Sequence, residues 1–567
     1  MDIDTFYTED QEELEKYLQT KNVSSIEKIH HKSADQGYGL DIKDSSNDMS
    51  YLEFFVNKKI LTYINNKTDR YPIKELIIKN NILTKLPDAL GKLTTLEELI
   101  LYLPELTELP ESIGNLTSLI KFHRYKGKLI DLPESMGQMI NLDDIRFENI
   151  RSIPDSIVNL TNLTSLVIND GEVTTLPASI GNLINLSSLS CMRNQLTELP
   201  ASIVNLINLS SLGLGGNQLT ELPASIGNFS NLKYFSCEDN KITELPASFN
   251  KLVKLTTLYF GNNQITELPK AIGSFVDLRE LQFNNNLITE IPEGLFRLTE
   301  LKTLSSGNNR ITELSESIGN FADLEKLFLN NNRIKKLPKS IGRLSYLEWF
   351  RLQHNEIKEL PETIDGMTRV RDLELYHNQL SELPESIGNM PRLYHLKLHC
   401  NQLTHLPESI GDLLQLSFLS LHQNKLQELP KSIGNIHKLE EINLRDNQLT
   451  KLPASIVKLR KLRYLNLANN QLTELPRGMN NMRLEILNLS NNQLTRLPTS
   501  LTKVYIKELH IGQNPLDKLP SGLRMNKIYL HPDDDVIIPR FLKEKIIRGY
   551  PEDYNIDKGI STSWSCD

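Results

Sequence analysis

A repeat of 23 residues restricts the fold of this chain more than any other feature of its sequence. Asparagines recur at that interval from Asn194 to Asn470. Prolines recur from Pro177 to Pro292 and from Pro338 to Pro476, with Ser315 standing where one proline is missing. The general unit reads LxxLxLxxNxLTxLPxxIGNL, and about twenty such units lie between Ile73 and Leu523. Stacked repeats also explain a length of 567 residues, because a single globular core stops growing near about 250 residues.

Each segment of a unit, such as residues 209–231 (LSSLGLGGNQLTELPASIGNFSN), has a physical role. In LxxLxL the last two leucines alternate with other residues, which predicts a short strand with one inward and one outward face. The asparagine that follows, here Asn217, lies where the chain turns inward, and its amide can both donate to and accept from the turn backbone. The LTELP and SIGNL segments then return the chain over the outer side. One unit cannot bury its own apolar edge, so stability must come from stacking on its neighbours.

The signature LTELPxSIGNL, carried by about four fifths of the chain, resembles the intracellular Ras-group leucine-rich-repeat proteins of plants. It is also similar to the related Ras-pathway scaffold proteins of animals and to repeats in many bacterial proteins. The resemblance implies an α/β solenoid, a leucine-rich-repeat horseshoe with a concave parallel β-sheet. It implies protein binding as the function, with a small Ras-like GTPase as the suggested partner.

Departures from the pattern cluster near the beginning of the chain. Pro104, Gly127 and Gly171 replace the asparagine, and the unit that starts at Leu142 reaches its proline two residues early. These changes predict irregular curvature in the first repeats.

The loss of the repeat at both ends predicts three regions. Residues 1–70 are expected to form a helical N-terminal cap, residues 71–525 the leucine-rich-repeat solenoid, and residues 526–567 a C-terminal cap and tail. Within the last region, residues 541–550 (FLKEKIIRGY) are predicted to form a short amphipathic helix that covers the final unit.

The composition favours a soluble cytoplasmic protein. The net charge is −8 and basic runs are lacking, so neither nucleic acid nor a membrane is expected as a partner. The chain starts without the basic and apolar segments of a secretory signal, and no apolar stretch approaches the roughly 18 residues of a transmembrane helix. Cys191, Cys237, Cys400 and Cys566 lack paired spacing, which favours a reducing compartment. The Asn-x-Ser triplet at Asn208 falls inside the repeat and is interpreted as structural.

The outward positions of the strands form the predicted partner-binding surface. Counting the first leucine of a unit as zero, these are positions +2, +4, +6 and +7. They carry small residues such as Ser188, Gly213 and Ser236 in the middle of the chain, and large residues from Leu324 onward. Aromatic and arginine side chains are enriched at interface centres, so we predict that a protein partner binds there. We call this set the concave patch: Lys326, Phe328, Trp349, Arg351, His354, Tyr376, His377, His395, Lys397, His399, Phe418 and His422.

Simpler interpretations of these residues remain open. The rings could stack across strands and only shield the sheet. Arg351, Glu374 and Lys397 share position +4 in consecutive units, which predicts a charge ladder that largely neutralises itself. Five histidines and Cys400 could bind zinc or sense pH, but parallel side chains do not converge and the CxxC and HxxxH spacings are absent, so solvated histidines are the default. A smaller aromatic pair, Tyr234 with Tyr259, predicts a second contact.

The sequence contains no recognisable catalytic motif. We find no GxxxxGK[ST] loop, no GxGxxG followed by kinase motifs, no GxSxG elbow and no HExxH helix. Cys566 followed by Asp567 resembles the catalytic cysteine motif of bacterial leucine-rich-repeat ubiquitin ligases, but the helical domain of those enzymes is missing. The prediction is therefore a non-catalytic, monomeric scaffold or adaptor without cofactor or metal. The alternatives are the substrate-recognition arm of a ubiquitin ligase or kinase, and a structural spacer or homodimer.

Overall fold

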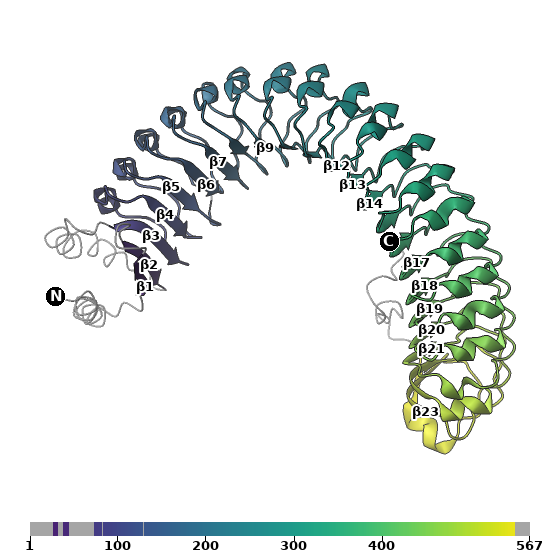
Figure 1. Ribbon diagram of the computed structural model, residues 1–567. Helices are drawn as coiled ribbons and strands as arrows, with labels where there is room; N and C mark the ends of the chain where they lie inside the picture. Colours follow the sequence, from purple (N-terminus) through teal and green to yellow (C-terminus); the bar gives the residue numbers. More distant parts are fainter. Residues whose placement is uncertain (1–25, 32–37, 45–72, 82, 129, 550–567) are drawn as a thin grey trace, which may run out of the picture. The chain divides into compact units, whose positions relative to one another are not determined.

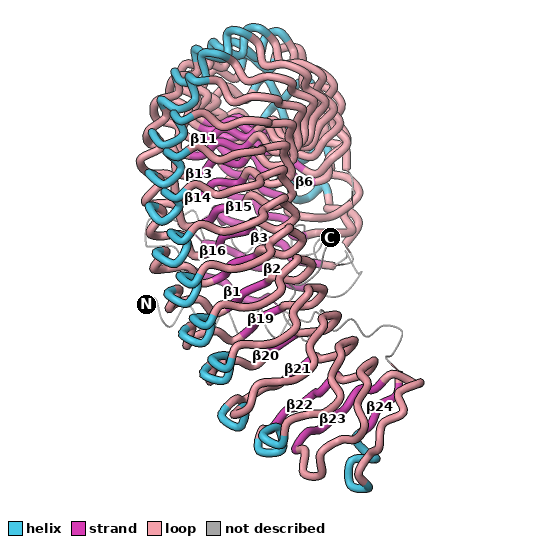
Figure 2. Tube along the Cα trace, turned by 90° about the vertical axis from the view of Figure 1, so that its right-hand side faces the viewer, coloured by secondary structure: helices cyan, strands magenta, loops and turns pink. Residues whose placement is uncertain are grey.

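The computed structural model describes residues 26–31, 38–44, 73–81, 83–128 and 130–549. By its contacts the chain divides into two compact units, residues 1–278 and residues 279–567. Within each unit, parallel strands line the inner side and short helices the outer side (Figure 1), and Figure 2 shows strands and helices as separate columns. The parallel solenoid that the sequence predicts is confirmed.

The strands of unit 1 follow the period of the sequence. β1 pairs antiparallel with β2, and β2 pairs in parallel with β3. From β3 to β11, each strand pairs in parallel with the next one along the chain. These strands are β1 (Ile26–His31), β2 (Tyr38–Asp44), β3 (Ile73–Asn80), β4 (Glu98–Tyr102), β5 (Lys121–Arg124), β6 (Asp144–Glu148), β7 (Ser165–Asn169), β8 (Ser188–Ser190), β9 (Ser211–Gly213), β10 (Tyr234–Ser236) and β11 (Thr257–Tyr259).

Unit 2 repeats the same arrangement, with parallel pairing of neighbours from β12 to β24. Its strands are β12 (Glu280–Gln282), β13 (Thr303–Ser305), β14 (Lys326–Phe328), β15 (Trp349–Arg351), β16 (Asp372–Glu374), β17 (His395–Lys397), β18 (Phe418–Ser420), β19 (Glu441–Asn443), β20 (Tyr464–Asn466), β21 (Ile486–Asn488), β22 (Tyr505–His510), β23 (Arg524–Leu530) and β24 (Ile546–Arg548).

The outer side is built from 3-10 helices, most of which begin directly after the repeat proline. The fixed φ of proline suits this position, and Ser315 replaces proline by accepting a hydrogen bond from the Ser317 amide. In unit 1 the helices are η1 (Asp88–Lys92), η2 (Glu111–Asn115), η3 (Glu134–Gln138), η4 (Asp155–Asn159), η5 (Ile180–Asn182), η6 (Ala201–Asn205), η7 (Ala224–Asn228), η8 (Ala247–Lys251) and η9 (Lys270–Ser274).

In unit 2 the helices are η10 (Glu293–Arg297), η11 (Glu316–Asn320), η12 (Lys339–Arg343), η13 (Glu362–Gly366), η14 (Glu385–Asn389), η15 (Glu408–Asp412), η16 (Lys431–Asn435), η17 (Ala454–Lys458), η18 (Met479–Asn481), η19 (Thr499–Lys503) and η20 (Arg540–Lys545).

The glycine of the SIGN segment lies where successive helices approach closely. A Cβ atom on Gly388 of η14 would lie 2.2 Å from the backbone oxygen of Ser409 in η15. Backbone cannot yield as a flexible side chain does, so the close stacking of these two helices requires glycine.

We expect the change Gly388→Ala to destabilise unit 2 by about 1–3 kcal/mol, because the added carbon overpacks the contact between η14 and η15. Urea denaturation of the full chain measures this loss. Lys431→Ala, at an exposed position of η16, is the matched control and should change stability by less than about 0.5 kcal/mol. Equal midpoints for the two variants would contradict the steric explanation.

The repeat asparagines form the predicted ladder inside each unit. In unit 1, the side-chain Nδ2 of Asn217 donates to the backbone oxygens of Cys191 and Leu214, at 2.8 and 2.9 Å. Its Oδ1 accepts from the amide of Leu196 at 2.9 Å. The same pattern recurs in unit 2, for example at Asn378. Each asparagine therefore satisfies buried backbone groups of its own repeat and of the preceding one.

A second asparagine ladder, which the sequence analysis missed, runs along the other end of the strands in unit 1. Asn208 Nδ2 donates to the backbone oxygen of Ile184 at 2.8 Å, and Asn185 does the same to Thr161. The structural interpretation of the triplet at Asn208 is thereby supported.

Near the beginning of the chain, where other residues replace the repeat asparagine, Arg124 makes hydrogen bonds to the backbone in its place. It occupies a core leucine position and is fully buried. Its guanidinium donates to the backbone oxygens of Lys128, at 2.7 Å, and Glu148, at 2.5 Å. A Cβ atom on Gly127 would lie 2.6 Å from the same guanidinium, so this glycine makes room for the arginine.

The ends of the chain differ from the sequence prediction. The part of residues 1–70 that is described consists of β1 and β2, which extend the sheet instead of forming a helical cap; the rest of that range lies outside the described residues. The alternation of apolar residues in YGLDIKD is typical of a strand.

At the other end, β23 and β24 continue the sheet beyond residue 525. The helix predicted over residues 541–550 is found only in the first half of that range, because the 3-10 helix η20 ends at Lys545 and β24 follows it. Cys566 and the predicted tail from residue 550 lie outside the described residues.

Candidate partner-binding surface

The concave patch lies on five consecutive strands of unit 2, from β14 to β18, whose residues are in register. One row across these strands is Lys326, Trp349, Asp372, His395 and Phe418, and a second row is Phe328, Arg351, Glu374, Lys397 and Ser420. Strands of a sheet are about 4.8 Å apart, so each row spans about 20 Å. The structure therefore brings the predicted residues together on one surface.

The charge ladder at position +4 is confirmed. The Arg351 guanidinium lies over the Phe328 ring, 4.9 Å from its centroid, and its Nε is 3.5 Å from Glu374 Oε2. The Lys397 amine donates to the other oxygen of Glu374 at 3.0 Å. Glu374 therefore holds two cations in place, and the three residues together carry one positive charge.

Histidine and tyrosine rings form stacks across the strands. His354 stacks on His377 with centroids 4.3 Å apart. Tyr376 stacks on His399 at 4.4 Å, and His399 stacks on His422 at 4.3 Å. The two stacks meet edge to face between His354 and Tyr376, at 5.5 Å. These contacts fix the rings before any partner binds.

The stacking divides the concave patch into buried and accessible members. His399, His422 and Phe418 are only 3%, 5% and 7% exposed, so the prediction that they contact a partner directly is corrected. Their rings are covered by neighbouring rings, and Phe418 also packs against Tyr464 and Ile486. Trp349, in contrast, is 38% exposed. The accessible part of the patch is therefore centred on β15 and β16.

Burial controls the charge of the two inner histidines. Loss of solvation, reinforced by neighbouring positive groups, lowers the pKa of His399 to about 2 and that of His422 to about 4. Ser420 Oγ lies within hydrogen-bond distance of Nδ1 of both rings, at 3.1 and 3.0 Å, and Asn443 donates its amide to His422 Nδ1 at 3.2 Å. Both rings are therefore neutral near pH 7.

The histidines do not gather into a metal site. His354 and His377 stand parallel, and the Cys400 thiol donates to Gln423 Oε1 at 2.7 Å. Within the residues that the structure describes, no group of three or more His, Cys, Asp or Glu side chains could hold a metal ion.

Sequence reasoning missed the partners that position the accessible residues. Asp372 binds Nδ1 of His395, and the exposed ring of Tyr394 contacts the same imidazole edge to face at 4.7 Å. Both residues lie in the same repeats as the predicted set, so their register could have identified them.

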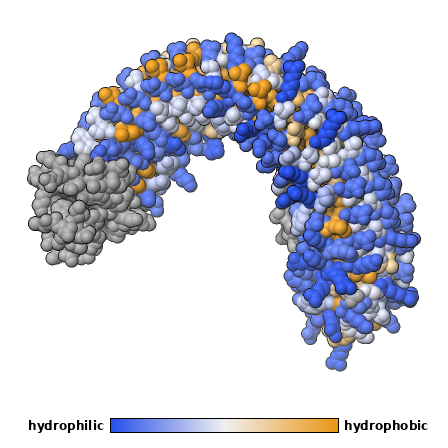
Figure 3. Space-filling model, in the orientation of Figure 1, coloured by the Kyte–Doolittle hydropathy of each residue, from blue (hydrophilic) through white to orange (hydrophobic). Residues whose placement is uncertain are grey.

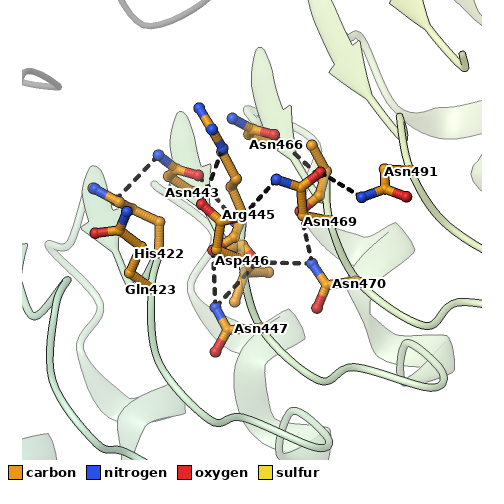
Figure 4. Close-up of polar contacts among 12 residues, drawn as sticks. His422, Gln423, Asn443, Arg445, Asp446, Asn447, Asn466, Asn469, Asn470 and Asn491 are labelled. Atoms are coloured by element: carbon orange, nitrogen blue, oxygen red, sulfur yellow. Dashed lines mark hydrogen bonds and ion pairs between the residues drawn. The ribbon is translucent and has the colours of Figure 1, made fainter. Parts of the chain in front are cut away.

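The polar surface continues beyond the concave patch along β19 to β21 (Figure 4). Asn491 donates to Asn469 at 3.0 Å, Asn469 donates to Asp446, and Arg445 pairs with Asp446 at 3.1 Å. These side chains bind one another at positions +6 and +7, so this stretch is occupied by internal hydrogen bonds.

Unit 1 carries two smaller clusters. Tyr234 and Tyr259, the pair for which the sequence predicts a second partner contact, meet edge to face at 5.9 Å. In addition, His123 Nε2 lies 2.9 Å from Asp144 Oδ2, and Tyr125 OH lies 3.2 Å from His123 Nδ1. Burial opposes ionisation of Asp144, but hydrogen bonds from His123 and Ser165 lower its pKa to about 2.

None of the helices in the described part of the chain is both long and apolar enough to span a bilayer.

Comparisons with known proteins agree with the repeat architecture. A model of the leucine-rich repeat region matches residues 201–313, 312–405 and 400–463, and a second leucine-rich-repeat model matches residues 461–482 and 483–504. No curated protein matches the chain in sequence.

Solved structures of leucine-rich-repeat proteins are similar to the chain. A leucine-rich-repeat protein of Leptospira interrogans is 32% identical, with 64% of this chain and 88% of that chain covered and a TM-score of 0.53. The plant peptide hormone receptor RGFR1 in complex with RGF2 is 25% identical, with 84% and 87% covered and a TM-score of 0.66. The ectodomain of the receptor kinase GASSHO1 from Arabidopsis thaliana, in complex with Casparian strip integrity factor 2, is 26% identical, with 88% and 70% covered and a TM-score of 0.58. The repeat signature, the parallel solenoid and these matches agree, and the chain belongs to the leucine-rich-repeat proteins.

Proposed function

We propose that this protein is a non-catalytic scaffold or adaptor that binds a protein partner on the concave patch of unit 2. The observation that carries the proposal is a set of aromatic and cationic side chains on neighbouring repeats, of which Trp349, Arg351 and Tyr376 are the accessible centre. Arg351 is held over the ring of Phe328, and Tyr376 is stacked on His399. Such side chains bury a large area and lose little conformational freedom when a partner covers them. The related receptors RGFR1 and GASSHO1, each solved with its ligand, support a protein or peptide as the partner.

The finer parts of the proposal rest on the sequence. The protein acts as a monomer in the cytoplasm, where its thiols stay reduced, and serves intracellular signalling. The resemblance of LTELPxSIGNL to the Ras-group proteins suggests a small Ras-like GTPase as the partner class.

A triple substitution tests the proposal. We expect Trp349→Ala, Arg351→Ala and Tyr376→Ala together to reduce capture of the partner at least tenfold in a quantitative pulldown, because central aromatic and arginine residues dominate interface energies. The melting temperature should change little, because Trp349 is exposed and Arg351 and Tyr376 are only partly buried.

The matched control is Lys339→Ala, Arg343→Ala and Glu362→Ala, three exposed positions on the outer helices of the same repeats. It should capture the partner like the native chain. Equal capture by the patch variant and the control would show that the partner binds elsewhere.

A further inference from the structure

A row of positive side chains borders the concave patch in unit 2, at the end where the chain enters each strand. The residue before the first apolar position is basic in five of six consecutive repeats, and Gln415 is the exception. We call these residues the strand-entry ledge: Arg369, Arg392, Lys438, Lys461 and Arg483. Two earlier repeats of the same unit carry Glu300 and Asp323 at this position, so the ledge is a local reversal of charge in a chain with net charge −8.

The parallel ladder holds the ledge in line. Backbone hydrogen bonds connect the residues two places further along, for example from the amide of Tyr394 to the oxygen of Arg371 and from that of Arg463 to the oxygen of Glu440. Six adjacent strands are separated by five spacings of about 4.8 Å, so the cationic edge is about 24 Å long. This length matches an extended peptide segment of about seven residues.

No carboxylate of the described residues neutralises the charges of the ledge. Arg392, Lys461 and Arg483 have none within ion-pair distance in that part of the chain, and Lys438 donates to the neutral amide of Gln415 at 2.5 Å. Arg369 lies over the ring of Tyr346, 4.2 Å from its centroid. Some cations elsewhere in unit 2 are paired, such as Lys302 with Glu325.

The C-terminal end of the ledge, at Lys461 and Arg483, borders a surface depression. Arg460, Lys461 and Arg483 line an open depression together with Leu484 and the exposed ring of Tyr505. Arg463 and Glu485 lie in the same lining but bind each other, so they contribute no net charge. The remaining charged residues of the lining are the three cations and one carboxylate, that of Glu440. The depression therefore has an excess of positive charge beside the apolar side chain of Leu484.

The residues one place before the ledge position are more apolar in unit 1 than the ledge residues of unit 2. In unit 1, exposed apolar side chains such as Ile184, Ile207 and Val276 occupy the position just before the equivalent of the ledge. Figure 3 shows hydrophobic residues along the repeats of unit 1, whereas hydrophilic residues predominate over unit 2.

We propose that the strand-entry ledge binds an extended acidic segment of a protein partner. Arginine and lysine pair with carboxylates, and arginine can do so through two parallel hydrogen bonds. A nucleic acid fits less well, because its continuous phosphate backbone would place a charge against Glu440 of the depression, which pairs with no cation among the described residues, whereas a peptide can place an uncharged residue there. The inference deepens the proposed function and rests on it, because it gives the charge of the partner segment that lies beside the concave patch.

A synthetic probe tests the ledge without knowledge of the partner. The probe is a fluorescent peptide of alternating glutamate and serine, titrated with the full chain at moderate salt and followed by anisotropy. A glutamine–serine peptide and an oligothymidylate of similar length serve as comparison probes. We expect the acidic peptide to bind more than tenfold tighter than either of them.

Charge reversal locates the binding. The ledge variant Arg392→Glu, Lys461→Glu and Arg483→Glu should weaken binding of the acidic peptide at least tenfold. The control variant Arg310→Glu, Arg333→Glu and Lys335→Glu changes the net charge equally at exposed positions that follow the ladder asparagines, and should bind within twofold of the native chain. If the ledge variant fails to fold, Lys461→Gln with Arg483→Gln replaces it, with an expected loss of at least threefold.

The outcomes separate this inference from the proposed function. Equal weakening by both reversal variants, or preferential binding of the oligothymidylate, overturns the ledge proposal. The variant with Trp349, Arg351 and Tyr376 changed to alanine should still bind the acidic peptide. If the ledge variant captures the partner normally while that patch variant does not, the acidic-segment inference fails and the proposed function stands.

Discussion

Replacing Asn378 with alanine is expected to lower the free energy of unfolding by about 4 kcal/mol. The Asn378 side chain donates to the backbone oxygens of Leu352 and Leu375, both at 3.0 Å, and accepts from the amide of Ile357 at 3.0 Å. All of these groups are buried, and an unsatisfied buried polar group costs about 1–3 kcal/mol. Because the bonds join two repeats, the loss weakens the contact on which a stack depends.

Urea denaturation followed by tryptophan fluorescence measures this effect. The matched control is Asn389→Ala, which removes the same amide from an exposed hydrogen bond to Asp365 at 3.3 Å and should cost less than about 0.5 kcal/mol. A loss at Asn378 no larger than that at Asn389 would contradict the view that the ladder stabilises the solenoid.

Acidification from pH 6.5 toward pH 4 is expected to destabilise unit 2 through His399 and His422. Both folded pKa values lie below the value of about 6.5 that histidine has in an unfolded chain. In this window the unfolded chain binds protons that the folded chain does not, so stability falls as the pH falls. For His422, whose folded pKa is about 4, the shift corresponds to about 3 kcal/mol, fully lost only near pH 4.

The comparison variant is His399→Gln with His422→Gln, whose stability should depend less on pH between 6.5 and 5 than that of the native chain, even if it is lower throughout. His437→Gln removes an exposed histidine and should leave the pH dependence unchanged. Parallel stability curves for the native chain and the double variant would show that these rings are not buried in the neutral form.

The regular part of the fold could be predicted because one residue type has one role in every repeat. The ladder asparagines, the inward leucines and the proline before each outer helix are all visible as a period. The role of Arg124 could not be predicted in the same way, because the repeat pattern places leucine at its position. Only the structure shows that its guanidinium donates to the backbone oxygens of Lys128 and Glu148.

The candidate site was only partly predictable for a related reason. Register identifies which residues share the concave surface, and it correctly grouped Arg351, Glu374 and Lys397. It does not show which rings cover one another. His399 is buried because Tyr376 and His422 stack on its two faces, and that depends on side-chain rotations that a repeat pattern does not encode.

The central claim is that a protein partner covers the inner strands of unit 2. Hydroxyl-radical footprinting of the full chain, alone and with the protein that it captures, tests this claim most directly. Protection of Trp349 and Tyr376 at least fivefold greater than that of the exposed side chains in η12 to η15 is the predicted result. Protection confined to the outer helices, with Trp349 oxidised at the same rate in both states, would contradict it.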